Sequence, residues 1–298
     1  MNRAGIVILV FLIFGCVTSV ENEQPIMNDS GEDNHTVFEK NTSDLENITI
    51  AAFNVQVFGK SKSEKEEVME ILAKTMRNFD IIAMQEIRDK DQSALPLLIE
   101  RINSMPGEKY NYTVGPRLGR TSSKEQYAYI YNSKIKLLSN YTFNDTEDRF
   151  HREPYIARFV SEEFDFVLLV FHSDPDETPQ ELDALPIVLN HSMAEYPDEE
   201  DFIILGDLNA DCNYLKGSDN VSLRDYIWLI NDEDTTTKST VCNYDRIIIT
   251  NSTVDEYIQS GVFRFDLAYE LNQSTTEEVS DHYPVWASFT VQELLQEE

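Results

Sequence analysis

The sequence predicts an α/β domain in which two stacked β-sheets are flanked by helices. Segments with strand and helix patterns alternate over the first third of the folded region, and β-prone segments with little helical period fill the middle. Because sheets bury their apolar faces against other layers, helices outside two stacked sheets fit this order of elements. No internal repeat and no internal linker divides the 298 residues, so one large domain is expected.

Hydrophobic period and turn residues place the individual elements. A capping box at residues 63–66 (SEKE) predicts the start of a first helix, and Ser93 is the expected N-cap of a second. Residues 178–181 (TPQE) predict a third helix that Pro186 should kink or interrupt, and a fourth is expected around residues 223–229. Strands are predicted over residues 48–54, 81–84, 110–114, 127–131, 134–143, 156–160, 164–171, 202–205, 245–250, 262–266 and 283–290.

The chain is strongly acidic. It contains 24 Lys and Arg residues against 54 Asp and Glu residues, which gives a formal net charge of −30. Such a protein repels nucleic acid in bulk, so a polyanionic ligand would need a divalent metal ion and a local group of arginines to attract it. A hydrophobic content of 41% can fill a sizeable core, which argues against global disorder.

The N-terminal region has the pattern of a leader followed by an extension. Arg3 and the apolar run over residues 6–14 predict a signal peptide at residues 1–19, because the run is too short to span a bilayer comfortably. An uncleaved signal anchor is the alternative. Residues 20–47 are expected to form a disordered, acidic, glycosylated extension. The folded domain is predicted over 48–291 and an acidic tail over 292–298.

Glycosylation signals and cysteines agree with a secreted, extracellular protein. Leader cleavage would remove Cys16 and leave Cys212 and Cys242, which form an even pair in an oxidising compartment. Their disulfide would stabilise the fold by roughly 3–4 kcal/mol in the chain-entropy model, whereas two buried free thiols are the alternative. Asn-X-Ser/Thr sequons begin at Asn28, Asn34, Asn41, Asn47, Asn111, Asn140, Asn144, Asn190, Asn220, Asn251 and Asn272.

Polar side chains stand where several predicted strands end. The apolar run 202–205 reads as a buried strand, and Asp207 and Asn209 follow it directly. An ordinary Asp/Asn turn is the alternative for this segment. Carboxylate and carboxamide oxygens suit a hard cation such as Mg²⁺ or Ca²⁺, and two mature cysteines exclude a thiolate zinc site. The other strand-end residues are Asn54, Glu86, His172, Asp281 and His282.

Two of the five histidines, His172 and His282, belong to these strand ends. A single strand-end histidine is usually structural. Two of them, with Glu125 and Asp245 as possible orienting carboxylates, favour an acid–base pair. If the strands lie side by side, all these side chains are expected to converge on one rim of the sheets.

Eight segments together resemble the deoxyribonuclease I family of the endonuclease/exonuclease/phosphatase superfamily. Each segment is a weak signal alone, but they occur in the family's order over about residues 48–291. They are residues 51–59 (AAFNVQVFG), 84–89 (MQEIRD), 117–125 (RLGRTSSKE), 152–154 (REP), 171–173 (FHS), 206–212 (GDLNADC), 240–246 (TVCNYDR) and 280–285 (SDHYPV).

The resemblance implies a four-layer sandwich of two packed mixed β-sheets flanked by helices, and a metal-dependent DNA endonuclease that leaves 5′-phosphate ends. In the implied acid–base machinery, His172 is paired with Glu125. His282 is paired with Asp245. The other implied sites are Glu86, Asp207 and Asp281 for Mg²⁺, Asn54 and Asn209 for the scissile phosphate, Arg88, Arg152 and Tyr214 for DNA, and Asp211, Asp234, Thr236 and Thr240 for a structural Ca²⁺.

The sequence departs from the family pattern at several places. Ser123 replaces a groove-stacking Tyr, Gln56 replaces a phosphate-contacting Arg, and no cysteine stands between residues 140 and 151. Duplex binding, cutting preference and actin inhibition are therefore left open, although Tyr112 and Val114 match part of the actin contact surface. A monomer without a membrane span is expected. The alternatives are the same chemistry on a lipid or inositol phosphate, and a catalytically inactive secreted DNA-binding protein.

Overall fold

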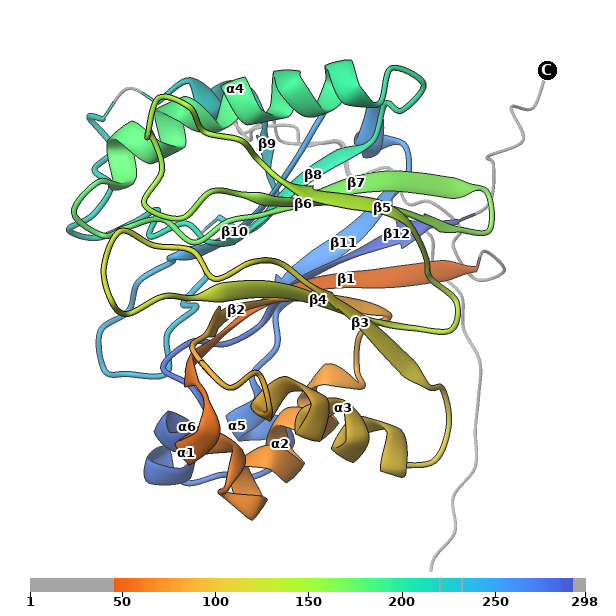
Figure 1. The fold of residues 1–298 in the computed structure, drawn as a ribbon, viewed down its shortest axis with the longest axis vertical. Coiled ribbons are helices and arrows are strands. Elements are labelled where there is room, and N and C mark those ends of the chain that lie inside the picture. The colour runs from red at the N-terminus through yellow and green to blue at the C-terminus, as the bar shows by residue number, and fades with distance from the viewer. Residues whose placement is uncertain (1–45, 220, 232, 292–298) are drawn as a thin grey trace, which may run out of the picture. The chain divides into compact units, whose positions relative to one another are not determined.

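The computed structural model describes residues 46–219, 221–231 and 233–291 of the chain (Figure 1). The predicted signal peptide, the acidic tail and all but the last two residues of the predicted extension lie outside the described residues. The same holds for the sequons at Asn28, Asn34, Asn41 and Asn220. Over the ranges that are described, no helix is long and apolar enough to cross a membrane.

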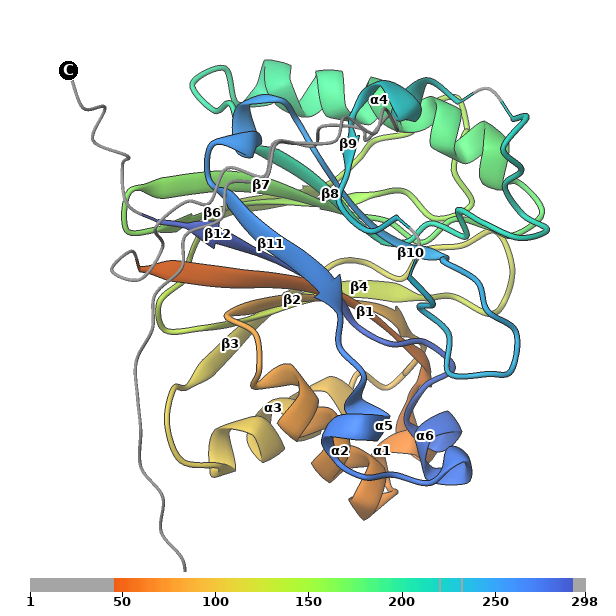
Figure 2. The same ribbon diagram turned by 180° about the vertical axis from the view of Figure 1, so that it is seen from behind.

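Two six-stranded mixed sheets pack face to face, as predicted (Figures 1 and 2). Their facing sides enclose one apolar layer, in which Tyr129 stacks on Tyr155 from the opposite sheet. The first sheet has the order β11 (Tyr257–Val262), β12 (Val285–Thr290), β1 (Asn47–Phe58), β2 (Ile81–Ile87), β4 (Gln126–Asn132) and β3 (Tyr110–Val114). The second has the order β5 (Lys136–Thr142), β6 (Tyr155–Ser161), β7 (Phe164–Val170), β8 (Phe202–Asp207), β10 (Asp245–Ile249) and β9 (Ile227–Trp228).

Helices cover the two outer faces and complete four layers (Figure 1). The second sheet is covered by α4 (Thr178–Glu195) and the short 3-10 turn η1 (Ser222–Asp225), which bury Leu185 and Leu223 against it. A second 3-10 turn, η2 (Ser252–Val254), follows β10. The first sheet is covered by α1 (Lys60–Ser63), α2 (Glu66–Met76), α3 (Ala94–Ser104), α5 (Phe265–Ala268) and α6 (Gln273–Val279).

Two helix starts differ from the predicted ones, and a third is confirmed in position but not in its capping side chain. Ser63 ends α1 instead of capping α2, because its Oγ donates to the carbonyl of Lys60. Ser93 is the N-cap of α3 by position, but its side chain makes no capping hydrogen bond. The Asp89 carboxylate instead accepts from the backbone N–H groups of Ser93 and Ala94. The third helix begins one residue early, at Thr178 itself, and Pro186 does not interrupt it.

Two predicted elements are wrong, and tertiary pairing explains both. The helix expected around residues 223–229 is η1 followed by β9, whose Ile227 and Trp228 pair with β10. The strand expected over 262–266 ends at Val262, and α5 follows. The strand β11 was not foreseen over Tyr257–Val262, where Gly261 packs against the Trp286 ring of β12. The helix α6 was not predicted either.

Strand directions bring the polar strand ends together. In the first sheet β1 runs parallel to β2, and in the second β7 runs parallel to β8, so each pair ends on the same side. Asp245 at the start of the antiparallel β10 is the register partner of Asp207. The two sheets are joined at this rim by a hydrogen bond of 2.9 Å from Asn54 Nδ2 to Asp207 Oδ2.

The approach of β7 to β8 depends on a glycine. Gly206 has a φ of 139°, and a Cβ on it would lie 2.0 Å from the carbonyl oxygen of Phe171. We expect Gly206→Ala to lower the unfolding free energy by about 3 kcal/mol or more, because backbone must move on one side. Urea unfolding measures this. Gly217→Ala is the control, since no heavy atom lies within 4 Å of that Cβ; equal stability of both variants would contradict the prediction.

A partly buried acid, Asp201, lies at the other end of β8. Burial and the charges of Glu256 and Asp165 raise the pKa of Asp201 to about 7. In the unfolded chain an aspartate ionises near pH ~4, so stability falls as the pH rises from about 4 through 7. Asp201→Asn should therefore raise the melting temperature at pH 8 by about 2–4 °C and leave it unchanged at pH 4. Asp91→Asn removes an equal charge from an exposed aspartate as a control. If the melting temperature of wild type and of both variants depended on pH in the same way, the raised pKa of Asp201 would be refuted.

Candidate active site

Two imidazole–carboxylate pairs face each other across one aspartate. His172 Nδ1 lies 2.9 Å from Glu125 Oε2, and His282 Nδ1 lies 2.7 Å from Asp245 Oδ2. The second ring nitrogen, Nε2, of each histidine lies 3.5 Å from the same atom, Asp207 Oδ2. The structure therefore brings together all four residues expected for acid–base chemistry, and each ring is oriented by its own buried carboxylate.

The loop after β7 holds His172 through its backbone. The His172 N–H donates to the hydroxyl of Tyr127 at 3.0 Å. The guanidinium of Arg152 donates to the carbonyls of His172 and Ser173 at 3.1 and 2.9 Å. Arg152 is only 6% exposed, so it supports this loop from beneath. Little of the Arg152 side chain is therefore accessible for the expected contact with DNA.

Backbone pairing also holds His282. The segment before Cys242 forms an isolated antiparallel bridge between Thr236 and His282, and the Tyr283 N–H donates to the Thr235 carbonyl at 2.7 Å. Ser280 Oγ accepts from the His282 N–H and donates to the Asn54 carbonyl. Both histidines thus stand on backbone that is bonded on more than one side.

Charges in the site stabilise ionised carboxylates and protonated rings. Burial alone would raise the pKa of Glu125, but the charges of His172, Arg152 and Arg88 lower it to about 2. Burial would lower the pKa of His282, but the carboxylates of Asp245 and Asp207 outweigh burial and raise the pKa to about 10. Burial and the Arg152 charge oppose a similar change at His172, where Glu125 nevertheless raises the pKa. Both rings thus favour their protonated form, whereas burial raises the pKa of Asp245 against the opposing charge of His282.

The oxygen donors of the site fit a hard divalent cation. Asn54 Nδ2 bridges Glu86 Oε1 at 3.2 Å and Asp207 Oδ2 at 2.9 Å. Within the described ranges, the three residues whose donor atoms lie within 4.8 Å of one another are Asp207, Asp245 and His282. Within that group Asp245 and His282 are hydrogen-bonded to each other, while Asp207 accepts from Asn54 Nδ2 and the Asn209 N–H. Asp207 also belongs to the predicted Mg²⁺ set, with Glu86 beside it and Asp281 at the rim.

The segment between Asn54 and Phe58 has strained backbone and a partly buried lysine, Lys62, beneath it. Gln56 and Val57 have φ angles of 41° and 52°, which β-branched residues rarely adopt. Lys62 Nζ donates to the carbonyls of Val55 and Gln56, and to that of Val279 at the end of α6, at 2.9, 2.6 and 2.9 Å. This lysine was missed by sequence reasoning, because nothing distinguishes it from the other lysines of a polar segment.

We expect Lys62→Met to loosen that segment, since three carbonyls lose their donor. Unfolding free energy should fall by about 1–3 kcal/mol. Hydrogen exchange should quicken at the amides of Gln56 and Val57, which donate to Asn54 Oδ1 and Glu86 Oε2. Lys65→Met, on an exposed lysine three positions away, should change neither quantity. Unaltered protection at both amides in Lys62→Met would show that the lysine does not hold the segment.

Three further predicted residues line the rim. The Arg88 guanidinium lies 2.8 Å from Glu125 Oε1 and 3.1 Å from Glu86 Oε2, and its side chain is 30% exposed. Tyr214 stacks near Tyr244 with ring centroids 5.3 Å apart, and the Tyr244 ring lies 6.3 Å from that of His282. Asn209 has a φ of 48° and donates to the Ser173 carbonyl.

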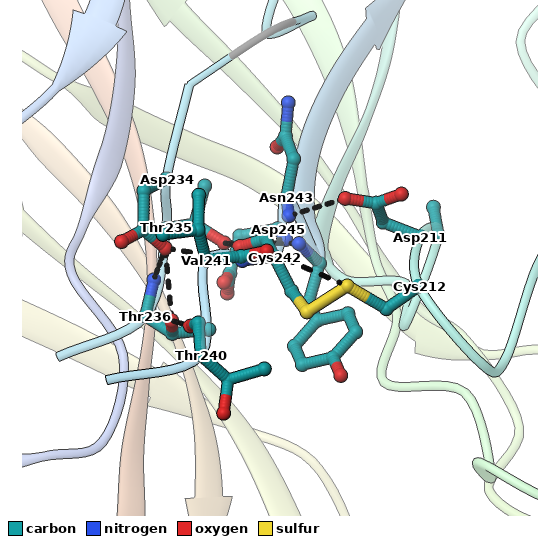
Figure 3. The surroundings of a disulfide bond; sticks show 12 residues. Asp211, Cys212, Asp234, Thr235, Thr236, Thr240, Val241, Cys242, Asn243 and Asp245 are labelled. Carbon is teal, nitrogen blue, oxygen red and sulfur yellow. Dashed lines mark hydrogen bonds between the residues drawn. A yellow bond between two sulfur atoms is a disulfide. The ribbon is translucent and has the colours of Figure 1, made fainter. Parts of the chain in front are cut away.

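Cys212 and Cys242 form a disulfide with a Cα–Cα distance of 5.9 Å, which confirms the predicted pairing (Figure 3). Three of the four residues expected to bind structural calcium share one turn beside it. Asp234 Oδ1 accepts from the Thr236 N–H, and the Thr236 hydroxyl lies within hydrogen-bond distance of both Asp234 Oδ1 and the Thr240 carbonyl, either of which can accept its one proton. Asp211 lies across the disulfide from this turn and accepts from the Asn243 N–H (Figure 3).

Known proteins with this fold and sequence are nucleases and their relatives. The Endonuclease/Exonuclease/phosphatase family profile matches residues 51–282. Mouse deoxyribonuclease gamma is 38% identical over 260 residues, which cover 80% of this chain and 83% of the relative. Horse deoxyribonuclease-1 is 35% identical over 256 residues, which cover 80% of this chain and 90% of the relative. The crystal structure of an endonuclease/exonuclease/phosphatase family protein from Bacteroides thetaiotaomicron matches with a TM-score of 0.60 at 17% identity. The match covers 84% of this chain and 99% of that protein, and it supports the fold.

The fold and the paired histidines thus define a member of a hydrolytic family rather than a binding module built on an unrelated scaffold. The chain belongs to the endonuclease/exonuclease/phosphatase family, in its deoxyribonuclease I branch.

Proposed function

We propose that this protein is a secreted, divalent-metal-dependent DNA endonuclease that hydrolyses phosphodiester bonds to 5′-phosphate products. The observation that carries the proposal is the pair of carboxylate-oriented histidines whose Nε2 atoms both lie 3.5 Å from Asp207 Oδ2. Such a pair can place one proton acceptor and one proton donor on opposite sides of a phosphate. The deoxyribonuclease relatives support DNA as the substrate.

In the proposed reaction, one imidazole accepts a proton from the attacking water and the other donates a proton to the leaving 3′ oxygen. Both rings are oriented through Nδ1 by a carboxylate, so the Nε2 atom of either one can take either role. Asn54 and Asn209 would contact the scissile phosphate through their side-chain amides. A bound Mg²⁺, held by Glu86, Asp207 and Asp281, would supply positive charge to the phosphate as it becomes more negative.

The net charge of −30 makes that metal ion important for substrate binding as well. Arg88 and Tyr214 are proposed DNA contacts at the rim, and Arg152 reaches DNA only if the loop above it moves. A Ca²⁺ ion is proposed near Asp234, Thr236 and Thr240, with Asp211, where it would stiffen the disulfide-bonded segment.

Secretion is supported by two observations on the folded part. The disulfide fits an oxidising compartment. The described sequon asparagines are all exposed at the surface, as glycan attachment requires. They are Asn47, Asn111, Asn140, Asn144, Asn190, Asn251 and Asn272.

A plasmid-nicking assay with purified protein tests the proposal. Wild-type protein should nick DNA with Mg²⁺ and Ca²⁺ and stop when a chelator is added. His172→Ala and His282→Ala should each reduce the rate by about 10²–10⁴, the range for losing an acid–base residue. His191→Ala, on the exposed face of α4, should retain full activity.

Full activity of His172→Ala would remove that residue from the mechanism. Sphingomyelin and inositol phosphate assays run beside the plasmid assay separate the lipid and inositol alternatives. DNA binding without cleavage across several metals would indicate an inactive binding protein.

A further inference from the structure

Two cations on the rim, the exposed Lys238 and the partly exposed Arg88, are paired with carboxylates that are proposed to hold the metal ion. Lys238 Nζ lies 2.8 Å from Asp281 Oδ2, and the Lys238 side chain is 53% exposed. Arg88 pairs in the same way with Glu86 at 3.1 Å. Glu86 and Asp281, the two carboxylates at the edge of the proposed metal site, thus each have a cationic partner that solvent can reach.

The backbone beneath Lys238 is anchored independently of that ion pair. The Thr237 N–H donates to the Asp281 carbonyl at 2.9 Å, and Thr237 Oγ1 donates to the Ser280 carbonyl at 2.9 Å. Gln273 Nε2 donates to the Thr237 carbonyl at 2.7 Å. The Lys238 backbone therefore stays beside the site when its ammonium leaves Asp281. Its flexible four-carbon stem allows the ammonium to turn toward solvent.

We propose that Lys238 binds a DNA phosphate, and that divalent metal binding at Asp281 releases it to do so. The inference rests on the proposed function. An Asp281 oxygen that coordinates a metal ion no longer attracts the ammonium strongly, because the metal ion neutralises its charge. An exposed ion pair of this kind contributes little free energy, so a divalent cation can displace it. The freed ammonium then lies beside the position proposed for the scissile phosphate.

This exchange predicts two effects of opposite sign in Lys238→Met. Mg²⁺ should bind about two- to fivefold more tightly, because the competing ammonium is gone. DNA should bind more weakly at saturating Mg²⁺, and the slope of log affinity against log salt should fall by about 1, as for the loss of one phosphate contact. A purely structural lysine would weaken both ligands together.

Isothermal titration calorimetry with MgCl₂ measures the first effect. Fluorescence anisotropy of a labelled duplex in a His172→Ala background, which leaves the DNA uncut, measures the second. Lys65→Met is the control, because Lys65 forms an ion pair of similar length, 2.9 Å to Glu278 against 2.8 Å for Lys238, with a side chain that is 49% exposed. Lys238→Arg keeps the charge and should keep the DNA affinity.

Tighter Mg²⁺ with weaker DNA in Lys238→Met, and neither change in Lys65→Met, supports the proposal. Equal behaviour of the two methionine variants overturns it, and so does a parallel loss of both affinities in Lys238→Met. Wild-type protein that fails to nick plasmid would instead count against the proposed function. The calorimetric comparison needs no DNA, so it separates these two failures.

Discussion

The hydrogen bond from Asn54 Nδ2 to Asp207 Oδ2 joins the functional ends of the two sheets. Its partners are 153 residues apart, and both are almost completely buried. Asn54 comes from the centre of one sheet and Asp207 from the centre of the other, so this contact closes the seam between them. The same Asp207 oxygen faces both histidines. Each histidine can therefore be placed only if the two sheets meet in this register.

The contact between the two sheets brings several buried carboxylates together, and this determines where positive charges are needed. Burying Asp207, Asp245 and Glu125 close together would be costly without positive partners. The two imidazoles supply those partners inside the site, and Arg88 and Arg152 supply them around Glu125. The negative charges of Asp207, Asp245 and Glu125 are thus balanced by the protein's own side chains. Glu86 and Asp281, at the edge of the site, pair with cations that solvent can reach. The cations at this edge are open to solvent, whereas those around Glu125 are the protein's own buried or partly buried side chains.

Sequence reasoning succeeded where local pattern decides the structure. Apolar runs ending in polar residues located β7 and β8 and the side chains that follow them. Glu125 and Asp245 could be named as candidate orienting carboxylates, but which histidine each one holds was implied only by family resemblance, since Glu125 and His172 are 47 residues apart. Local pattern failed where a short β-prone segment lay inside a stretch expected to be helical. Ile227 and Trp228 are residue types that favour strands, and they form an edge strand because β10 offers a partner.

Backbone strain explains why other features of the site could not be predicted from the types of residue in the sequence. Positive φ angles occur at Gln56, Val57, Glu86 and Asn209, all beside the two histidine pairs. Such conformations cost free energy and persist only where surrounding bonds determine them. Here the Val57 N–H is held by Glu86 Oε2. The carbonyl of Gln56 is held by Lys62. The lysine, the strained turn and the carboxylate form one connected unit, so the position of Glu86 depends on a residue that never faces the substrate.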